Sequence, residues 1–196
     1  MTDKPKRRWY RGIPLVLFLA TAVLIALSVY ALVAFRRHSI EQYQLEALRR
    51  RDEWISDTIK DLKAGNTHVH LYSCGNSDVL IERIAGMPEV HCIKFEGAAD
   101  MTYESLSQLP TFPNLTHVVF HGESSLNDQT IIVLSKCPRL ESVTIIQSYV
   151  TDAGLEDLAK IPRLRRFGHA GQFSKTALDR LQKQLPNCTI EEVLYY

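Results

Sequence analysis

Hydrophobic and polar positions follow three different patterns along the chain. Residues 13–35, IPLVLFLATAVLIALSVYALVAF, form one apolar run without a charged side chain. Residues 36–65 place apolar side chains at spacings of three, four and seven, which is typical of one face of a helix. From residue 66 onward, short segments of alternating apolar and polar residues recur between polar turns. The patterns predict three successive parts behind a short tail of residues 1–12.

The apolar run predicts a transmembrane helix. A helix over residues 13–35 is about 34 Å long, enough to cross a hydrocarbon layer of about 30 Å. The tail before it carries five basic side chains, so the positive-inside rule predicts a cytoplasmic N-terminus and a single-pass protein whose remainder lies on the outer, periplasmic or extracellular, side. A cleaved signal peptide ending near Val29-Tyr30-Ala31 is the alternative, and the length of the run favours the anchor.

Residues 36–65 predict a second helical segment that is rich in good helix formers and ends at Gly65. Its apolar stripe, interrupted by Asp52, consists of Leu45, Leu48, Ile55, Ile59 and Leu62. We expect its second half to cover the exposed apolar end of the domain that follows. A dimerising coiled coil is the alternative, but the stripe supplies barely three heptads with a charge in the seam.

Prolines reveal an internal repeat in residues 66–196. Pro88, Pro113, Pro138, Pro162 and Pro186 are separated by 25, 25, 24 and 24 residues. Five and seven residues after the first four prolines lie mostly apolar pairs, whose alternation predicts short half-buried strands. These pairs are Ile93 and Phe95, Val118 and Phe120, Val143 and Ile145, and Phe167 and His169, and the same register makes Val69 and Leu71 an additional strand.

Each predicted strand leads through a polar turn to a short helix with capping residues at its start. The predicted caps are Ser77-Asp78, Thr102, Asn127-Asp128, Thr151-Asp152 and Ser174. In the most regular copy, the helix is expected to run from a cap at Thr151 to Lys160. A single strand and helix cannot bury both apolar faces, so the copies must stack, with parallel strands on a concave side and helices on a convex side.

The repeat resembles a known family. Leu115-x-x-Val118-x-Phe120 and Leu140-x-x-Val143-x-Ile145 match the L-x-x-L-x-L pattern of leucine-rich repeats. The helix opening Thr151-Asp152-Ala153-Gly154-Leu155 and the turn Leu185-Pro186-Asn187-Cys188 resemble a subtype known from bacterial proteins. Over residues 67–196, the resemblance implies an α/β fold, a short leucine-rich repeat solenoid preceded by a transmembrane helix and a juxtamembrane helix.

The sequence departs from that family at the turn after each strand. The Asn or Cys usual there is Cys74 in the leading unit, whereas later units offer other residues, namely Ala98, Glu123, Ser148 and Gln172. His169 and the final unit also stray from the strand pattern. We therefore expect an incomplete hydrogen-bond ladder and an irregular, short arc.

Charge and cysteine content narrow the function classes. The formal net charge is +1, but the tail alone carries +4, and residues 66–196 carry −4. An acidic repeat domain lacks the basic footprint of a nucleic-acid binder, and the tail fits anionic lipid headgroups better. Cys137 and Cys188 occupy columns filled elsewhere by apolar residues, so we interpret them as buried hydrophobes and predict no disulfide framework.

The outward positions of the predicted strands hold the polar chemistry of the domain. His68, Cys92 and His117 are expected in one row across neighbouring strands, with His70 and other polar residues nearby. Imidazole and thiolate are zinc ligands, but a flat row is poor geometry for ligands that must converge. A metal-binding or hydrolytic site here is therefore an alternative.

Recognition is the function that these residues favour. The sequence lacks a phosphate-binding loop, a G-x-S-x-G elbow, an H-E-x-x-H motif and a regular C-x-x-C pair, so we expect no enzyme and no cofactor. We predict a membrane-anchored module that binds a protein or peptide through its concave strand face; a purely structural envelope anchor is a further alternative. The predicted contact residues are Tyr72, Lys94, Glu96, His117, His121 and Arg166.

Overall fold

The computed structural model describes the backbone of residues 15–72, 77–97, 101–122 and 126–193. The basic tail of residues 1–12, the first two residues of the predicted membrane span, and the turn positions Cys74, Ala98 and Glu123 lie outside the described residues. The chain divides into two compact units, Met1–Arg50 and Arg51–Tyr196, and each is described by itself.

The first unit contains most of α1, which runs Leu15–Lys63. Its apolar side chains from Leu19 to Phe35 are exposed along the helix. Among the described residues, α1 is the one helix long and apolar enough to cross a membrane, judged by length and composition alone. The helix closes as expected near Gly65, where the Gly65 N–H donates to the Leu62 carbonyl (3.0 Å) and the Asn66 N–H donates to the Asp61 carbonyl (3.0 Å).

The second unit is an α/β structure built on a six-stranded parallel sheet with strand order β1-β2-β3-β4-β5-β6. Consecutive strands pair residue by residue, and helical segments connect them. The strands are β1 (His68–Tyr72), β2 (Cys92–Glu96), β3 (His117–His121), β4 (Ser142–Ile146), β5 (Arg166–His169) and β6 (Thr189–Glu192). The helical segments are α2 (Ser77–Ile84), α3 (Tyr103–Leu106), the 3-10 turn η1 (Leu109–Thr111), α4 (Asp128–Leu134), α5 (Gly154–Leu158) and α6 (Lys175–Gln184).

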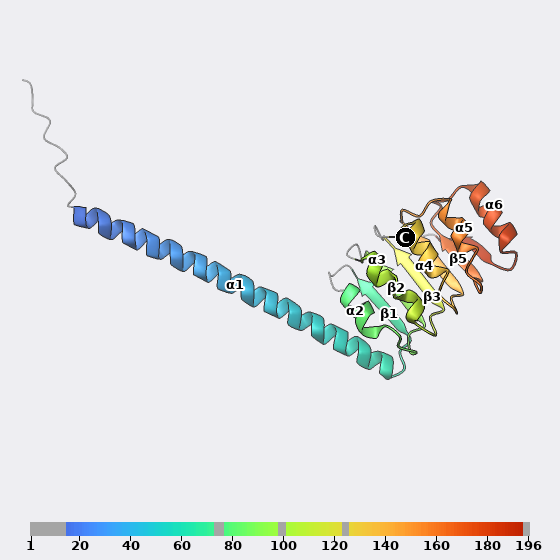
Figure 1. Cartoon of the computed structure of the whole chain (residues 1–196), viewed down its shortest axis with the longest axis horizontal. Coiled ribbons are helices and arrows are strands. Elements are labelled where there is room, and N and C mark those ends of the chain that lie inside the picture. The colour runs from blue at the N-terminus through green and yellow to red at the C-terminus, as the bar shows by residue number, and fades with distance from the viewer. Residues whose placement is uncertain (1–14, 73–76, 98–100, 123–125, 194–196) are drawn as a thin grey trace, which may run out of the picture. The chain divides into compact units, whose positions relative to one another are not determined.

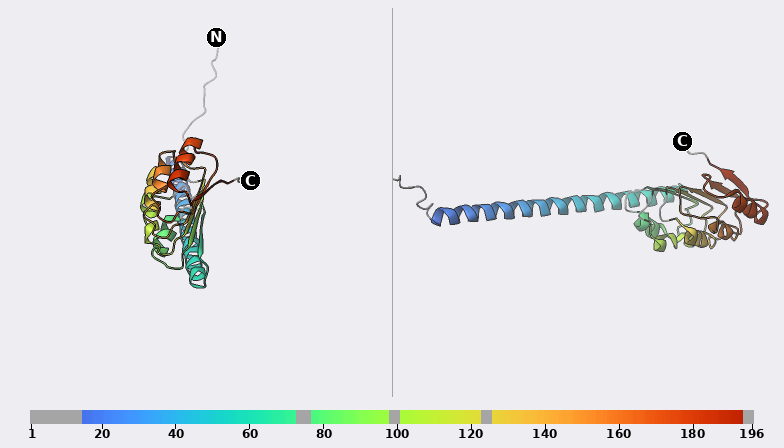
Figure 2. Two further views of the ribbon diagram at one scale, coloured as in Figure 1. Left: turned by 90° about the vertical axis from the view of Figure 1, so that its right-hand side faces the viewer. Right: turned by 90° about the horizontal axis from the view of Figure 1, so that it is seen from above.

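Helices α2–α6 all lie on one face of the sheet, and none of them covers the other face (Figures 1 and 2). Between sheet and helices lies one hydrophobic cluster. The strand residues predicted to face inward are all buried, and the rings of Phe95 and Phe120 stack with centroids 4.6 Å apart. His169 also occupies its inward position, 5.8 Å from the Phe167 ring and 5.9 Å from the Phe173 ring.

The C-terminal end of α1 contributes to this core. Ile55 and Leu62 are buried in the hydrophobic cluster, and Trp54 and Ile59 pack against it. Those residues belong to the second unit, which begins at Arg51. The second half of the predicted stripe therefore buries apolar side chains in the hydrophobic cluster of the second unit.

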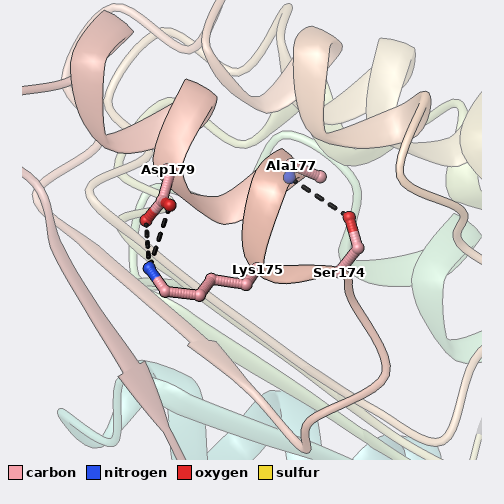
Figure 3. Close-up of polar contacts among 4 residues, drawn as sticks. All are labelled: Ser174, Lys175, Ala177 and Asp179. Carbon is pink, nitrogen blue, oxygen red and sulfur yellow. Dashed lines mark hydrogen bonds and ion pairs between the residues drawn. The ribbon is translucent and has the colours of Figure 1, made fainter.

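Side-chain caps begin three of the helices where the sequence predicts them. Thr102 accepts a hydrogen bond from the Ser105 N–H (3.2 Å), and Asn127 accepts from the Gln129 N–H (2.9 Å). Ser174 Oγ accepts from the Ala177 N–H (3.2 Å), and Lys175 and Asp179 form an ion pair one turn further along α6 (Figure 3). Such caps satisfy N–H groups that have no partner inside the helix.

The predicted cap at Thr151 and helix end at Lys160 are wrong. Helix α5 runs Gly154–Leu158, and Ala153 precedes it in a helical backbone conformation. Thr151 lies two residues before Ala153: its N–H and its hydroxyl donate to the Asp128 carboxylate at 2.8 and 2.7 Å, and its hydroxyl oxygen accepts from the Ala153 N–H at 3.2 Å. The chain therefore completes a turn before the helix begins.

Aspartates connect successive units across their helix starts. Asp78 accepts from the Thr102 N–H (3.0 Å), Asp128 from Thr151, and Asp152 from the Ser174 N–H (3.0 Å). Hydrogen bonds from Ser174 hold the pKa of the Asp152 carboxyl below its usual range. A Cβ on Gly154 would lie 2.4 Å from Asp128 Oδ1, so glycine is required for this approach. These contacts bond successive units to one another.

Candidate recognition surface

The sheet face opposite the helices, called here the outward face, carries the polar strand residues in rows. Register pairs His68 with Cys92, Cys92 with His117, and so on to the last strand, so each row crosses the sheet. The first row is His68, Cys92, His117, Ser142, Arg166 and Thr189; the second is His70, Lys94, Val119, Thr144, Gly168 and Glu191; the third is Tyr72, Glu96, His121 and Ile146. The predicted columns are therefore observed.

An ion pair lies at the centre of the first three strands. Lys94 Nζ and a Glu96 carboxylate oxygen are in contact on the outward face of β2, and both side chains are about three-quarters buried. Tyr72 and His121 are the register neighbours of Glu96, and His70 is the neighbour of Lys94. Four of the six predicted contact residues thus come together around one salt bridge: Tyr72, Lys94, Glu96 and His121.

The charged groups near Glu96 lower the pKa of its carboxyl. The hydrogen bond from Lys94 lowers the pKa of the Glu96 carboxyl, and the charges of Lys94, His70 and His121 lower it further. The His70 and Tyr72 rings face each other with centroids 6.2 Å apart, and Tyr72 is half exposed. The arrangement presents a fixed ion pair, two imidazoles and a phenol to whatever contacts this part of the sheet.

Threonines orient the imidazoles at the start of β1 and β3. His68 Nδ1 lies 3.1 Å from the Thr67 hydroxyl, and His117 Nδ1 lies 2.8 Å from the Thr116 hydroxyl. The Thr116 hydroxyl also donates to the His91 carbonyl (3.1 Å), so its one proton is used there. It therefore accepts from His117 Nδ1–H, which leaves His117 Nε2 directed away from the threonine.

Metal binding in the first row has no support in the described part of the chain. No group of three or more His, Cys, Asp or Glu side chains among those residues is arranged to hold a metal ion. Burial raises the pKa of the Cys92 thiol, although the Lys94 charge opposes the shift.

Several outward positions of β4 and β5 are buried. Ile146 is 1% exposed and Ser142 is 9% exposed, although both alternate with core residues and point away from the helices. Gly168 is buried as well, and a Cβ on it would lie 2.9 Å from Val193 Cγ2. Ile146, Ser142 and Gly168 are therefore not accessible to a partner, although they lie on the outward face, and Val193, which follows β6, lies over Gly168.

Arg166 lies apart from the other predicted contacts. It is separated from His117 by Ser142 in the first row, and it forms an exposed ion pair with Glu191 of β6 at 3.8 Å. Sequence reasoning missed both Glu191 and Val193, since the final unit does not follow the strand pattern. The Pro186 register is one residue out at this strand: the first-row residue follows each of the other prolines by four positions, whereas Thr189, the register partner of Arg166, follows Pro186 by three.

Comparisons with known proteins add little. No protein-family model matches the chain, and no curated protein matches its sequence. Among solved structures, the chain is similar to "Leiomodin-1 Actin-Binding Site 2 (ABS2)", with 13% sequence identity and a TM-score of 0.45, over 62% of this chain and 80% of that one. At that level of similarity the match bears on neither fold nor function.

Proposed function

We propose that the protein is a membrane-anchored leucine-rich repeat module that recognises a protein or peptide through the outward face of its sheet. The proposed architecture is a short solenoid, with this face concave and the helices convex. Its support is that six consecutive strands pair residue by residue. Paired residues are 24 or 25 positions apart in the chain, as the prolines are, except between β5 and β6, where they are 23 apart. Stacked units with such spacing are the physical signature of repeat proteins.

The single observation that carries a recognition function is the cluster around Lys94 and Glu96. It combines a fixed ion pair, an exposed tyrosine and imidazoles on a rigid set of paired strands. Aromatic and charged side chains held by a rigid scaffold give contacts at low entropic cost, and tyrosine is enriched in protein interfaces. The proposed function is non-catalytic binding.

Membrane attachment through residues 13–35 is part of the proposal. Its support is the exposed apolar surface of α1 between Leu19 and Phe35, which costs free energy in water and is satisfied in a bilayer. We propose a cytoplasmic N-terminus, with the repeat domain on the opposite side. In sealed vesicles of known orientation, added protease should remove the repeat domain only from the outer face; removal from the cytoplasmic face would contradict the orientation.

Site-specific photo-crosslinking tests the recognition surface. A photo-reactive amino acid replaces Lys94 on the outward face or, as a matched control, the exposed Lys183 on α6. We expect one discrete adduct from position 94 in native membranes, identified by mass spectrometry, and no adduct of the same mass from position 183. Equal labelling from both positions, or none from position 94, would leave a purely structural anchor as the better description.

A further inference from the structure

We infer that the edge of the sheet where β4, β5 and β6 begin is a second binding surface, which holds a short acidic segment of a partner protein through fixed positive charge. This surface, called here the basic edge, consists of the segments that lead from a helix into each of these strands, residues 135–142, 159–166 and 183–189. The inference goes beyond the proposed function, because the Lys94–Glu96 ion pair lies on β2 and is not part of these segments.

Positive charge in the repeat domain is concentrated on the basic edge. Residues 66–196 carry 11 basic and 15 acidic side chains, a net charge of −4. The basic edge holds seven of the basic side chains and one of the acidic ones, so its net charge is +6 and the rest of the domain carries −10. The seven are all exposed: Lys136, Arg139, Lys160, Arg163, Arg165, Arg166 and Lys183. The acidic one, Glu141, is partly buried.

Backbone hydrogen bonds hold the three segments side by side. The Arg165 and Arg166 N–H groups donate to the Glu141 carbonyl (2.8 and 3.0 Å), and the Thr189 N–H donates to the Arg165 carbonyl (2.8 Å). Strands paired in this way are about 4.8 Å apart. The backbone therefore keeps basic side chains of neighbouring segments close together, and an anion bound between them would offset their mutual repulsion.

Most of this charge has no acidic partner in the described part of the chain. Two of the seven basic side chains do form ion pairs, Lys160 with Asp157 and Arg166 with Glu191. Arg139 donates to the amide oxygen of Asn114 (2.8 Å), which is uncharged. Arg163 and Arg165 form no ion pair with any described residue. Both guanidinium groups are therefore available to an external carboxylate, with which arginine forms strong hydrogen bonds.

A groove between the last two segments adds a shape to this charge. Its volume is about 610 Å³, and Arg163 and Arg165 both line it. Its other walls include Pro162, Pro186 and the partly buried Leu185. A groove of this volume is large enough to receive side chains of a partner. Cationic and apolar walls together fit a segment in which an apolar residue lies between carboxylates.

The acidic remainder of the domain favours a short partner over an extended anionic surface. In physiological salt, charges are screened beyond about 8 Å, so a short segment on the basic edge is affected mainly by the edge itself. A membrane surface or a nucleic acid duplex extends beyond three neighbouring strands and would also approach the part of the domain that carries −10. We therefore assign the basic edge to a protein segment rich in aspartate or glutamate.

Peptide binding to the full-length chain at neutral pH tests the inference. The protein is held in nanodiscs of zwitterionic lipid, and the probe is a short fluorescein-labelled peptide with glutamates on both sides of one leucine. The double substitution R163Q and R165Q should weaken binding about tenfold, because it removes two unpaired charges from the groove. The same peptide with glutamine in place of glutamate should bind weakly to every variant.

A matched control separates the basic edge from charge in general. The double substitution K175Q and R180Q removes two exposed basic side chains of α6 that lie outside the basic edge. It makes the same change in net charge, and the basic tail attracts the probe equally in both variants, so binding should change less than about twofold. Circular dichroism checks that each variant is folded, and R163Q alone, with an expected loss of about threefold, serves if the double variant is not.

The outcomes separate this inference from the proposed function. Absence of binding to the unmodified chain, unchanged binding in R163Q and R165Q, or equal losses in the two double variants would overturn the inference. Displacement of the bound peptide by anionic vesicles, but not by zwitterionic ones, would overturn it too and would assign the basic edge to a membrane surface. The adduct expected from position 94 depends on none of these results, so the recognition function of the outward face stands or fails by its own experiment.

Discussion

The two halves of the outward face share one backbone pattern but differ in what they expose. Over β1–β3 the outward positions hold imidazoles, a tyrosine and the Lys94–Glu96 ion pair. Over β4 and β5, Ser142, Ile146 and Gly168 are buried, with Ile146 1% exposed and Gly168 beneath Val193, and Arg166 is the exposed exception. The register is continuous across both halves. Strand pairing therefore determines the face on which a side chain lies, whereas the residues packed around that side chain determine whether a partner can contact it.

The same contrast separates the histidines. His117 on the outward face is exposed, and its ring Nδ1 is hydrogen-bonded to the Thr116 hydroxyl. His169 on the inward face is 5% exposed and lies among aromatic rings. Burial lowers the pKa of His169, with partial opposition from Glu192. Residues of one type thus serve as surface groups on one face and as a core anchor on the other.

The largest expected change in the free energy of unfolding comes from a comparison of asparagine substitutions at two positions that are paired across adjacent strands. His121 and Ile146 are register partners on adjacent strands. Ile146→Asn should lower the free energy of unfolding by about 3 kcal/mol, because it removes a buried side chain and leaves an amide without water. His121→Asn should cost less than about 1 kcal/mol. Urea unfolding followed by fluorescence, to which Trp54 at the core contributes, measures both. Equal losses would mean that the two halves are equally closed.

A smaller effect tests the contact that closes the second half. Gly168→Ala should cost about 1 kcal/mol, since its Cβ would approach Val193 Cγ2 to 2.9 Å and Thr144 Oγ1 to 3.1 Å. Adding Val193→Ala should recover most of the loss by removing the nearer atom. If the double variant is no more stable than Gly168→Ala alone, Val193 does not lie over Gly168 in solution.

Acid should destabilise the core through His169. Its pKa is lower in the folded state than in the unfolded chain, where histidine titrates near pH 6.5. The stability it contributes is therefore complete above about pH 6.5, decreases as the pH falls, and is fully lost below the folded-state pKa. His169→Phe, which copies Phe95 and Phe120 at the matching inward positions, should flatten this part of the pH profile of unfolding. A profile unchanged by the substitution would contradict the assignment.

The smallest effect is expected at the Arg166–Glu191 pair. Its atoms are 3.8 Å apart and Arg166 is well exposed, so Arg166→Ala should change the free energy of unfolding by less than about 0.5 kcal/mol. The crosslink at position 94 should also persist, since β3 and β4 separate Arg166 from the strand that carries Lys94. Loss of that adduct in Arg166→Ala would extend the recognition surface across the whole sheet.

Much of the fold was predictable because it repeats. The strand columns, their parallel order and three of the helix caps follow from residue period and local chemistry that each unit restates. The start of α5 was not predictable, because Thr151 is held by Asp128 from 23 residues earlier. Local sequence carries no information about a contact with a side chain of another unit.

The sequence predicted the sheet face on which the candidate site residues lie, but not which residues of that face are exposed. Alternation placed Tyr72, Lys94, Glu96, His117, His121 and Arg166 on the outward face, and all six are there. The burial of Ile146 on that same face depends on residues distant in the chain, and alternation carries no information about them. Strand β6 is a further case, since its residues Glu191 and Glu192 lack the apolar alternation of the other strands.

By itself, the sequence determined the long apolar helix, the 24- to 25-residue period and the face on which each strand residue lies, because each depends on side chains close together in the chain. Only the tertiary structure decided that β6 extends the sheet, that Val193 covers Gly168, and that aspartates join successive units. The physical reason is that the unpaired backbone groups at the edge of β5 can hydrogen-bond a further strand even when the sequence of that strand lacks apolar alternation. That edge exists only once the preceding units have stacked.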